Sequence, residues 1–126
     1  MVLDASALLA YLHAEPGADI VGEALGADVV MSAVNWAEVL AKLHQGGLTP
    51  NAWRAVLADL RDIAVIPFTQ PDAEAAAALS LETRRLGLSL GDRACLVLAD
   101  TRQDTALTAD RVWSELLPRY RVRLIR

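Results

Sequence analysis

The sequence contains very little cysteine and few aromatic residues. Only one of its 126 residues is cysteine, and Phe, Trp and Tyr together make up 5%. A single cysteine excludes an intrachain disulfide framework and a multi-cysteine zinc site. A chain without disulfides is suited to a reducing cytoplasm, so we expect a cytoplasmic location. With so few aromatic side chains, Leu, Ala and Val must fill the core.

Long apolar runs and a basic N-terminal region are also missing. No segment reaches the ~18 uninterrupted apolar residues that span a bilayer, so no membrane segment is expected. The start, Met-Val-Leu-Asp, lacks a basic region, so no signal peptide is expected. Hydrophobic residues make up 54% and charged residues 22%, which excludes disorder. The length predicts one domain over residues 1–126.

Apolar strands alternate with helices along the chain. Val2-Leu3-Asp4 predicts a very short strand, and Ser6 is expected to cap the helix that follows. This alternation indicates an α/β fold whose central parallel sheet, of about five short strands, is covered on both faces by about seven helices. We expect a buried strand at 63–66 and further strands at 2–4, 29–31, 105–108 and 122–125. We expect helices at 6–13, 17–25, 33–45, 50–62, 71–87, 91–101 and 112–117.

Four carboxylates occupy special places in this pattern. Asp4 ends the first strand and Asp110 follows the 105–108 strand, and ligands of parallel sheets bind beyond the carboxyl ends of strands. Asp92 lies in the first turn of its helix, and Glu38 lies inside the 33–45 helix. Each has an alternative interpretation: the three aspartates could be helix caps, and Glu38 could be a surface residue.

Convergence of the four acids would require a cation, water or protonation. Two carboxylates about 5 Å apart repel by roughly 3 kcal/mol at an effective dielectric constant of about 20. An all-oxygen site suits Mg²⁺ or Mn²⁺ rather than zinc. The net charge of −4 argues against a generic nucleic-acid binder, but without these four acids 12 basic residues face 12 acidic ones. The acidity would then be local.

Four segments resemble a known family. They are VLDASALLAYL, SAVNWAEVLAKL, LSLGDRACLVLA and ALTADRVW, and their order, spacing and overall length resemble a PIN domain of the VapC toxin type. The resemblance covers essentially the whole chain. It implies a Mg²⁺-dependent endoribonuclease, with Mn²⁺ as a substitute, whose catalytic and metal-binding residues are Asp4, Glu38, Asp92 and Asp110.

The resemblance also assigns supporting roles. Ser6 and Thr108 match hydroxyl residues of the family, whereas Asn35 stands where Thr or Ser is more usual and is placed to hydrogen-bond to the site. Val112 and Trp113 replace a further acid found in some members, which puts a complete second metal site in doubt. The chain has one lysine, so RNA phosphates are expected to meet arginine. The candidates are Arg84, Arg85, Arg93 and Arg111.

The resemblance implies two protein partners. One is a second copy of the chain, and the 50–62 helix carries an apolar stripe at Trp53, Val56, Leu57 and Leu60 that fits self-association. The other is a small VapB-like antitoxin. We expect it to place an arginine into the acidic pocket and an apolar helix against the first and third helices, around Leu9, Leu12, Trp36 and Leu40.

The residues alone leave three alternative functions open. A receiver-like phosphoacceptor module also gathers acids at strand ends, but it needs a lysine near the pocket, and the only lysine is Lys42, in the Glu38 helix. A catalytically silent PIN-like binding module would keep the fold without activity. A metal-dependent nuclease of the same fold could cut DNA instead of RNA.

Overall fold

The computed structural model describes all residues from 1 to 126 as one α/β unit built on a parallel sheet. The sheet has five strands in the order β3-β2-β1-β4-β5, and every neighbouring pair is parallel. The strands are β1 (Val2–Leu3), β2 (Val30–Ser32), β3 (Ala64–Ile66), β4 (Ala106–Thr108) and β5 (Val122–Leu124). The α-helices are α1 (Ala5–Leu12), α2 (Ala18–Leu25), α3 (Ala33–Gln45), α4 (Pro50–Asp59), α5 (Gln70–Glu82) and α6 (Leu90–Arg102), and two 3-10 helices are η1 (Arg84–Leu86) and η2 (Arg111–Leu116).

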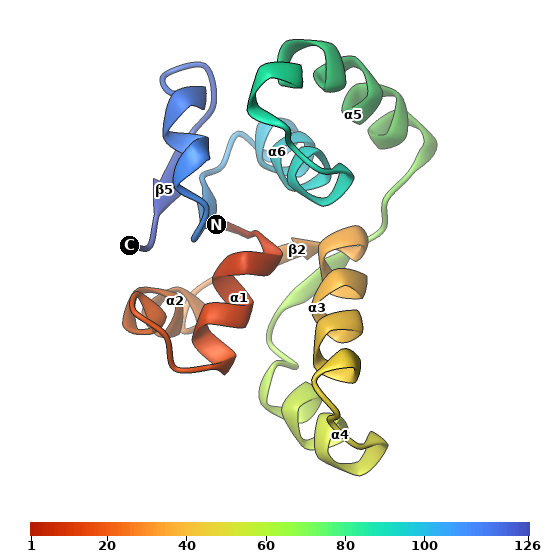
Figure 1. Cartoon of the computed structure of the whole chain (residues 1–126), viewed down its shortest axis with the longest axis vertical. Coiled ribbons are helices and arrows are strands. Elements are labelled where there is room, and N and C mark those ends of the chain that lie inside the picture. Colours follow the sequence, from red (N-terminus) through yellow and green to blue (C-terminus); the bar gives the residue numbers. More distant parts are fainter.

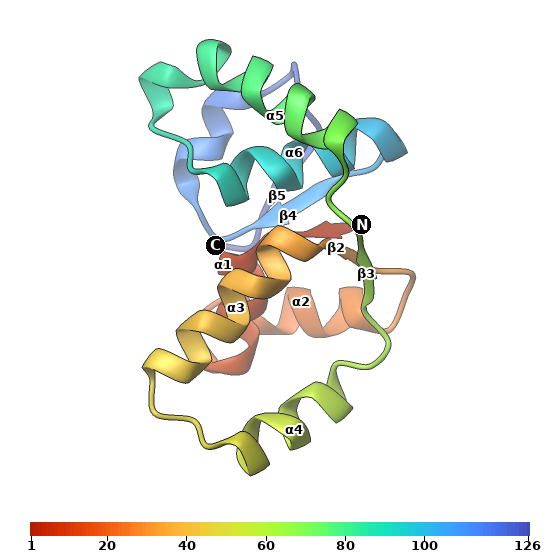
Figure 2. The same cartoon turned by 90° about the vertical axis from the view of Figure 1, so that its right-hand side faces the viewer.

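The sheet separates two hydrophobic cores. Consecutive residues of a strand point to opposite faces, so Val2 packs with α5, α6 and η2 while Leu3 packs with α1, α2 and α3. Val30 and Met31 of β2 divide in the same way. Figure 2 shows α5 and α6 on one side of the strands and the helices α1 to α4 on the other. The predicted α/β fold with a covered parallel sheet is confirmed.

Several predicted boundaries are wrong by a few residues. Asp4, and not Ser6, is the cap of α1, because its side chain accepts a hydrogen bond from the Ser6 backbone N–H and the helix already begins at Ala5. The second strand lies one residue later than predicted. The 50–62 helix ends at Asp59, α6 runs on to Arg102, and the last predicted helix is the 3-10 helix η2. The 71–87 prediction divides into α5 and η1 at Thr83.

The prediction that residues 63–66 form a buried strand is wrong for most of that segment. Ile63 is buried but precedes β3, whereas Ala64 and Val65 within it are exposed. β3 is an edge strand with β2 as its only neighbour, and no helix covers it fully. The apolar sequence of β3 is typical of a buried interior strand, yet two of its three residues are exposed to solvent.

α3 and α4 form an arm that extends from the body of the molecule (Figure 1). No residue of α4 is fully buried, and Leu60, which follows it, is the first to enter the core. His44 and Trp53 pack edge to face across the arm with ring centroids 5.1 Å apart. None of the helices combines the length and apolar character needed to cross a membrane.

Candidate metal centre

Asp4 lies at the centre of a buried hydrogen-bond network at the carboxyl end of β1. Its side chain is only 3% exposed. The Oδ2 atom accepts hydrogen bonds from the Ser6 hydroxyl at 2.5 Å and the Thr108 hydroxyl at 2.9 Å. The Oδ1 atom lies 3.4 Å from the Asn35 amide nitrogen, a long contact. Three elements, α1, β4 and α3, thus supply donors that orient this carboxylate.

The surroundings of Asp4 oppose its ionisation. Burial raises the pKa of Asp4 from its usual 3.8 to about 6, although hydrogen bonds from Ser6 and Thr108 lower it. The negative charges of Asp92 and Glu38 raise this pKa further, so both carboxylates lie close enough to act on Asp4. The pKa of the buried Cys95 thiol is also raised, by burial first and then by Asp4 and Asp92. Negative charge is therefore concentrated between β1, α3 and α6.

Glu38 reaches this region because α3 packs against the first turn of α6. The Asn35 amide donates a hydrogen bond to the Gly91 carbonyl oxygen at 2.9 Å, which joins the two helices. Glu38 lies one turn further along α3, and its carboxylate rests against Gly91. Asn35 is fully buried, and its Oδ1 atom has no hydrogen-bond partner.

Asp92 is held by the start of its own helix. The Ser89 backbone N–H donates to Asp92 Oδ2 at 2.7 Å, and the Asp92 N–H donates to the Ser89 hydroxyl at 3.2 Å. This reciprocal arrangement is a capping box. The capping interpretation of Asp92 is therefore correct, yet it uses only one carboxylate oxygen and leaves Oδ1 available.

Asp110 is placed by the hydroxyl groups that bind Asp4. The Asp110 N–H donates to the Thr108 hydroxyl at 3.1 Å, and the Ala109 N–H donates to the Ser6 hydroxyl at 3.0 Å. Asp110 Oδ1 accepts from the Val112 N–H at 3.0 Å and so caps η2. Its side chain is exposed, and its Oδ2 atom makes no hydrogen bond within the chain. Because Leu3 pairs with Leu107, Asp4 and Asp110 follow neighbouring strands at the same sheet edge.

The oxygen donors at this edge fit a hard divalent cation. As the side chains stand, no group of three or more His, Cys, Asp or Glu residues is gathered closely enough to hold a metal ion. Asp92 and Asp110 each keep one carboxylate oxygen free of capping, and the Asn35 Oδ1 atom is buried and unpaired. Carboxylate and amide oxygens are ligands that Mg²⁺ and Mn²⁺ accept. A cation would also offset the repulsion from Asp92 and Glu38, which adds to the effect of burial on the pKa of Asp4.

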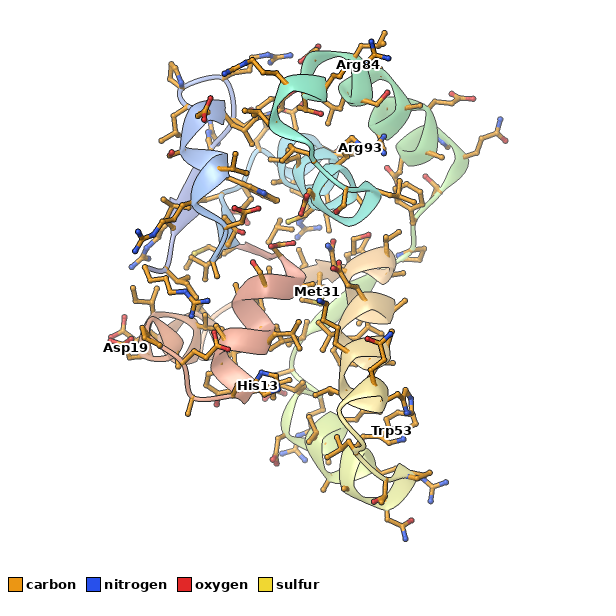
Figure 3. All side chains as sticks on the ribbon, in the orientation of Figure 1. His13, Asp19, Met31, Trp53, Arg84 and Arg93 are labelled. Carbon is orange, nitrogen blue, oxygen red and sulfur yellow. The ribbon has the colours of Figure 1, made fainter.

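The four arginines considered for RNA binding have different surroundings. Arg93 lies between α5 and α6 (Figure 3), where its Nη1 atom donates to the Ala76 carbonyl oxygen at 2.8 Å and its Nε atom has no partner. Arg85 forms an ion pair with Glu115 at 2.9 Å. Arg84 and Arg111 are exposed and form no ion pair. Arg93 is thus already engaged within the fold, a contact that residue type and spacing did not indicate.

The three cavities of the structure lie elsewhere. Each is lined by Arg119 and Tyr120, and none by Asp4, Glu38, Asp92 or Asp110. The Tyr120 hydroxyl donates to Glu82 at 3.2 Å, and burial raises the pKa of Tyr120. The acidic region is therefore not an enclosed pocket for a small molecule.

Comparison with known proteins identifies the class of this fold and site. The model of the PIN domain family matches residues 1–116, and the chain belongs to that family. Among solved structures, a chain of a toxin–antitoxin complex from Klebsiella pneumoniae superposes with a TM-score of 0.77 at 21% identity, covering 99% of this chain and 97% of that one.

Two further solved structures have the same fold. A chain of DNA-bound VapBC from Salmonella typhimurium has a TM-score of 0.77 at 14% identity and covers 99% of this chain and 97% of its own. A chain of FitAcB from Neisseria gonorrhoeae has a TM-score of 0.74 at 20% identity, with 98% and 96% covered. No curated protein sequence matches this chain.

Proposed function

We propose that the chain is a VapC-like toxin, a divalent-metal-dependent endoribonuclease that hydrolyses RNA phosphodiester bonds at the Asp4 site. The observation that carries the proposal is the position of the buried Asp4 at the carboxyl edge of a PIN-type sheet, where Ser6 and Thr108 orient it. There α3 brings Glu38 against Gly91, next to Asp92. An acidic region without a resident positive charge at its centre is suited to a cation. The proposed ligands and catalytic residues are Asp4, Glu38, Asp92 and Asp110, with Mg²⁺ as the ion and Mn²⁺ as its substitute.

The roles of the residues follow from their positions. Asp4 is oriented by the Ser6 and Thr108 hydroxyls, so its carboxylate is fixed before any ligand arrives. Asp92 and Asp110 are held through their caps and keep one oxygen each for the ion. When bound, the divalent cation supplies a water of lowered pKa and neutralises phosphate charge. Glu38 is the only one of the four carboxylates that caps no helix, and it is suited to orienting the attacking water.

RNA is the proposed substrate because Asp110 is exposed, Glu38 and Asp92 are partly exposed, and none of the three cavities encloses them. A polymer can be laid across an exposed site, whereas a small molecule needs an enclosing pocket. Arg84 and Arg111 are exposed and form no ion pair, so they are free to bind phosphates, and Arg85 is able to do so by exchanging Glu115 for a phosphate. Cleavage assays on single-stranded DNA of the same sequence distinguish an RNA nuclease from a DNA nuclease.

The experiment that tests the proposal measures ion binding and cleavage on the same variants. We expect Asp4→Asn, Glu38→Gln, Asp92→Asn and Asp110→Asn each to weaken Mn²⁺ binding by calorimetry and to slow RNA cleavage, while circular dichroism stays that of the folded chain. Glu74→Gln on the exposed face of α5 is the control and should change neither. Mn²⁺ binding without cleavage of any RNA would favour the silent binding module, and no binding at all would reject the metal site.

An antitoxin is the proposed partner. Leu9 and Leu12 on α1 and Trp36 and Leu40 on α3 are half-buried, so part of each apolar side chain remains open to a helix laid between α1 and α3. We expect expression of this chain alone in cytoplasm to slow growth, and co-expression of a small VapB-like protein to restore it. Leu9→Glu should abolish rescue but keep toxicity. Harmless expression of the unaltered chain would contradict the toxin assignment.

A further inference from the structure

The strongest unassigned feature is the contact between α3 and the second residue of α6. Gly91 is buried although it lies in the first turn of a helix, next to Asp92. A Cβ atom built on Gly91 would lie 2.6 Å from Glu38 Oε2, a distance that real contacts do not tolerate. The next nearest atoms, Asn35 Nδ2 at 3.4 Å and Glu38 Cδ at 3.6 Å, are at ordinary or nearly ordinary contact distances.

We propose that Gly91 is a positioning residue for the carboxylate of Glu38. The missing side chain leaves the space in which this carboxylate lies against the α6 backbone. This inference rests on the proposed metal site and adds to it a residue with no ionisable or coordinating group.

The backbone of α6 does not itself require glycine at this position. The left-handed glycines of the chain are Gly17, Gly47 and Gly87, and Gly91 is not among them. Alanine is the better helix former, so conformational preference alone favours Ala at residue 91. The glycine is therefore explained by what occupies the space beside it, and that is the end of a flexible and only half-buried side chain.

Because the neighbour of Gly91 is a flexible side chain, the substitution Gly91→Ala should affect the free energy of unfolding and the affinity for the ion differently. In Gly91→Ala the Glu38 carboxylate can rotate into solvent, so the methyl group lowers the free energy of unfolding only slightly. The higher helix propensity of alanine offsets that loss. The same rotation removes the carboxylate from Asp4 and Asp92. Disturbing a group that orients a metal site typically weakens the affinity about 10- to 100-fold.

The test compares Gly91→Ala with Gly22→Ala in α2. A Cβ on Gly22 would meet the Tyr11 ring at 3.4 Å, an ordinary contact, and that residue is remote from the acids. We expect both variants to melt at or above the temperature of the unaltered chain without metal. Only Gly91→Ala should weaken Mn²⁺ binding, measured by calorimetry. In cleavage assays this variant should raise the Mn²⁺ concentration that gives half-maximal cleavage more than it lowers the maximal rate.

A second pair of variants tests whether the effect passes through Glu38. In the Glu38→Ala background there is no carboxylate to displace, so adding Gly91→Ala should leave the Mn²⁺ affinity unchanged. An equal loss in both backgrounds, or no loss in Gly91→Ala alone, would overturn the proposal while leaving the metal site intact. Failure of the unaltered chain to bind Mn²⁺ would reject the site and this inference together.

Discussion

The carboxylate of Asp4 is subject to opposing influences from its neighbours. Burial and two nearby negative charges disfavour ionisation, and two hydroxyl donors favour it, with a net pKa of about 6. The folded chain therefore holds this proton more tightly than the unfolded chain, whose carboxyl titrates near 3.8. Ionisation costs folding free energy that is absent well below pH 3.8, grows as the pH rises from 3.8 towards 6, and is nearly constant above it.

Asp4→Asn removes that cost. The difference in unfolding free energy, variant minus unaltered chain, should rise between pH 3 and pH 7 by up to about 3 kcal/mol, since a pKa unit corresponds to 1.36 kcal/mol. Urea unfolding without metal at several pH values measures it, and Asp100→Asn on the exposed end of α6 is the control. A difference that does not vary with pH would contradict the raised pKa of Asp4.

The residues of the candidate site differ in how far the sequence revealed them. Asp4, Asp92 and Asp110 stand out because they follow strands or begin helices, and Ser6 and Thr108 lie two residues from an aspartate. Gly91 and the Arg93 contact with Ala76 could not be found in this way, because each depends on which helix packs beside α6. Spacing along one element predicts neighbours within it, whereas contacts between elements need the fold.

The two capping boxes offer a matched comparison between helices. Thr69 and Asp72 begin α5 in the same way that Ser89 and Asp92 begin α6. Thr69→Ala and Ser89→Ala should each lower the unfolding free energy by about 1 kcal/mol. Only Ser89→Ala should also weaken Mn²⁺ binding, because it frees the first turn that holds Asp92. Calorimetric titration of both variants measures this, and equal affinities would remove Ser89 from the support of the site.

Element positions were predictable where a local signal exists. Ser32, Thr49 and Ser89 are residue types that favour helix starts, and each caps its helix because its side chain binds an N–H group two or three residues away. The exposure of β3 was not predictable, since it depends on the order of strands in the sheet. The apolar stripe of α4 is likewise divided by the fold: Leu60 is buried, whereas Trp53, Val56 and Leu57 remain half-buried.

The half-buried apolar face of α4 leads to a prediction about the oligomeric state of the whole molecule. If α4 packs against a second copy, light scattering should give the mass of a dimer at tens of micromolar. Ala55→Glu adds a charge to the exposed part of α4 and should shift the mass to that of a monomer. Ala77→Glu makes the same change on α5 and should not. A dimer that survives Ala55→Glu would assign the interface to another surface.

The hydrogen bond from Thr108 to Asp4 joins residues 104 positions apart. During protein synthesis the first of these residues leaves the ribosome long before the second has been made. At about 5–20 residues per second, the growing chain spends roughly 5 to 20 s without the strand that completes the Asp4 network. Under the proposed function, a nascent chain, or one ended before Thr108, is therefore expected to be inactive, because its Asp4 network is incomplete.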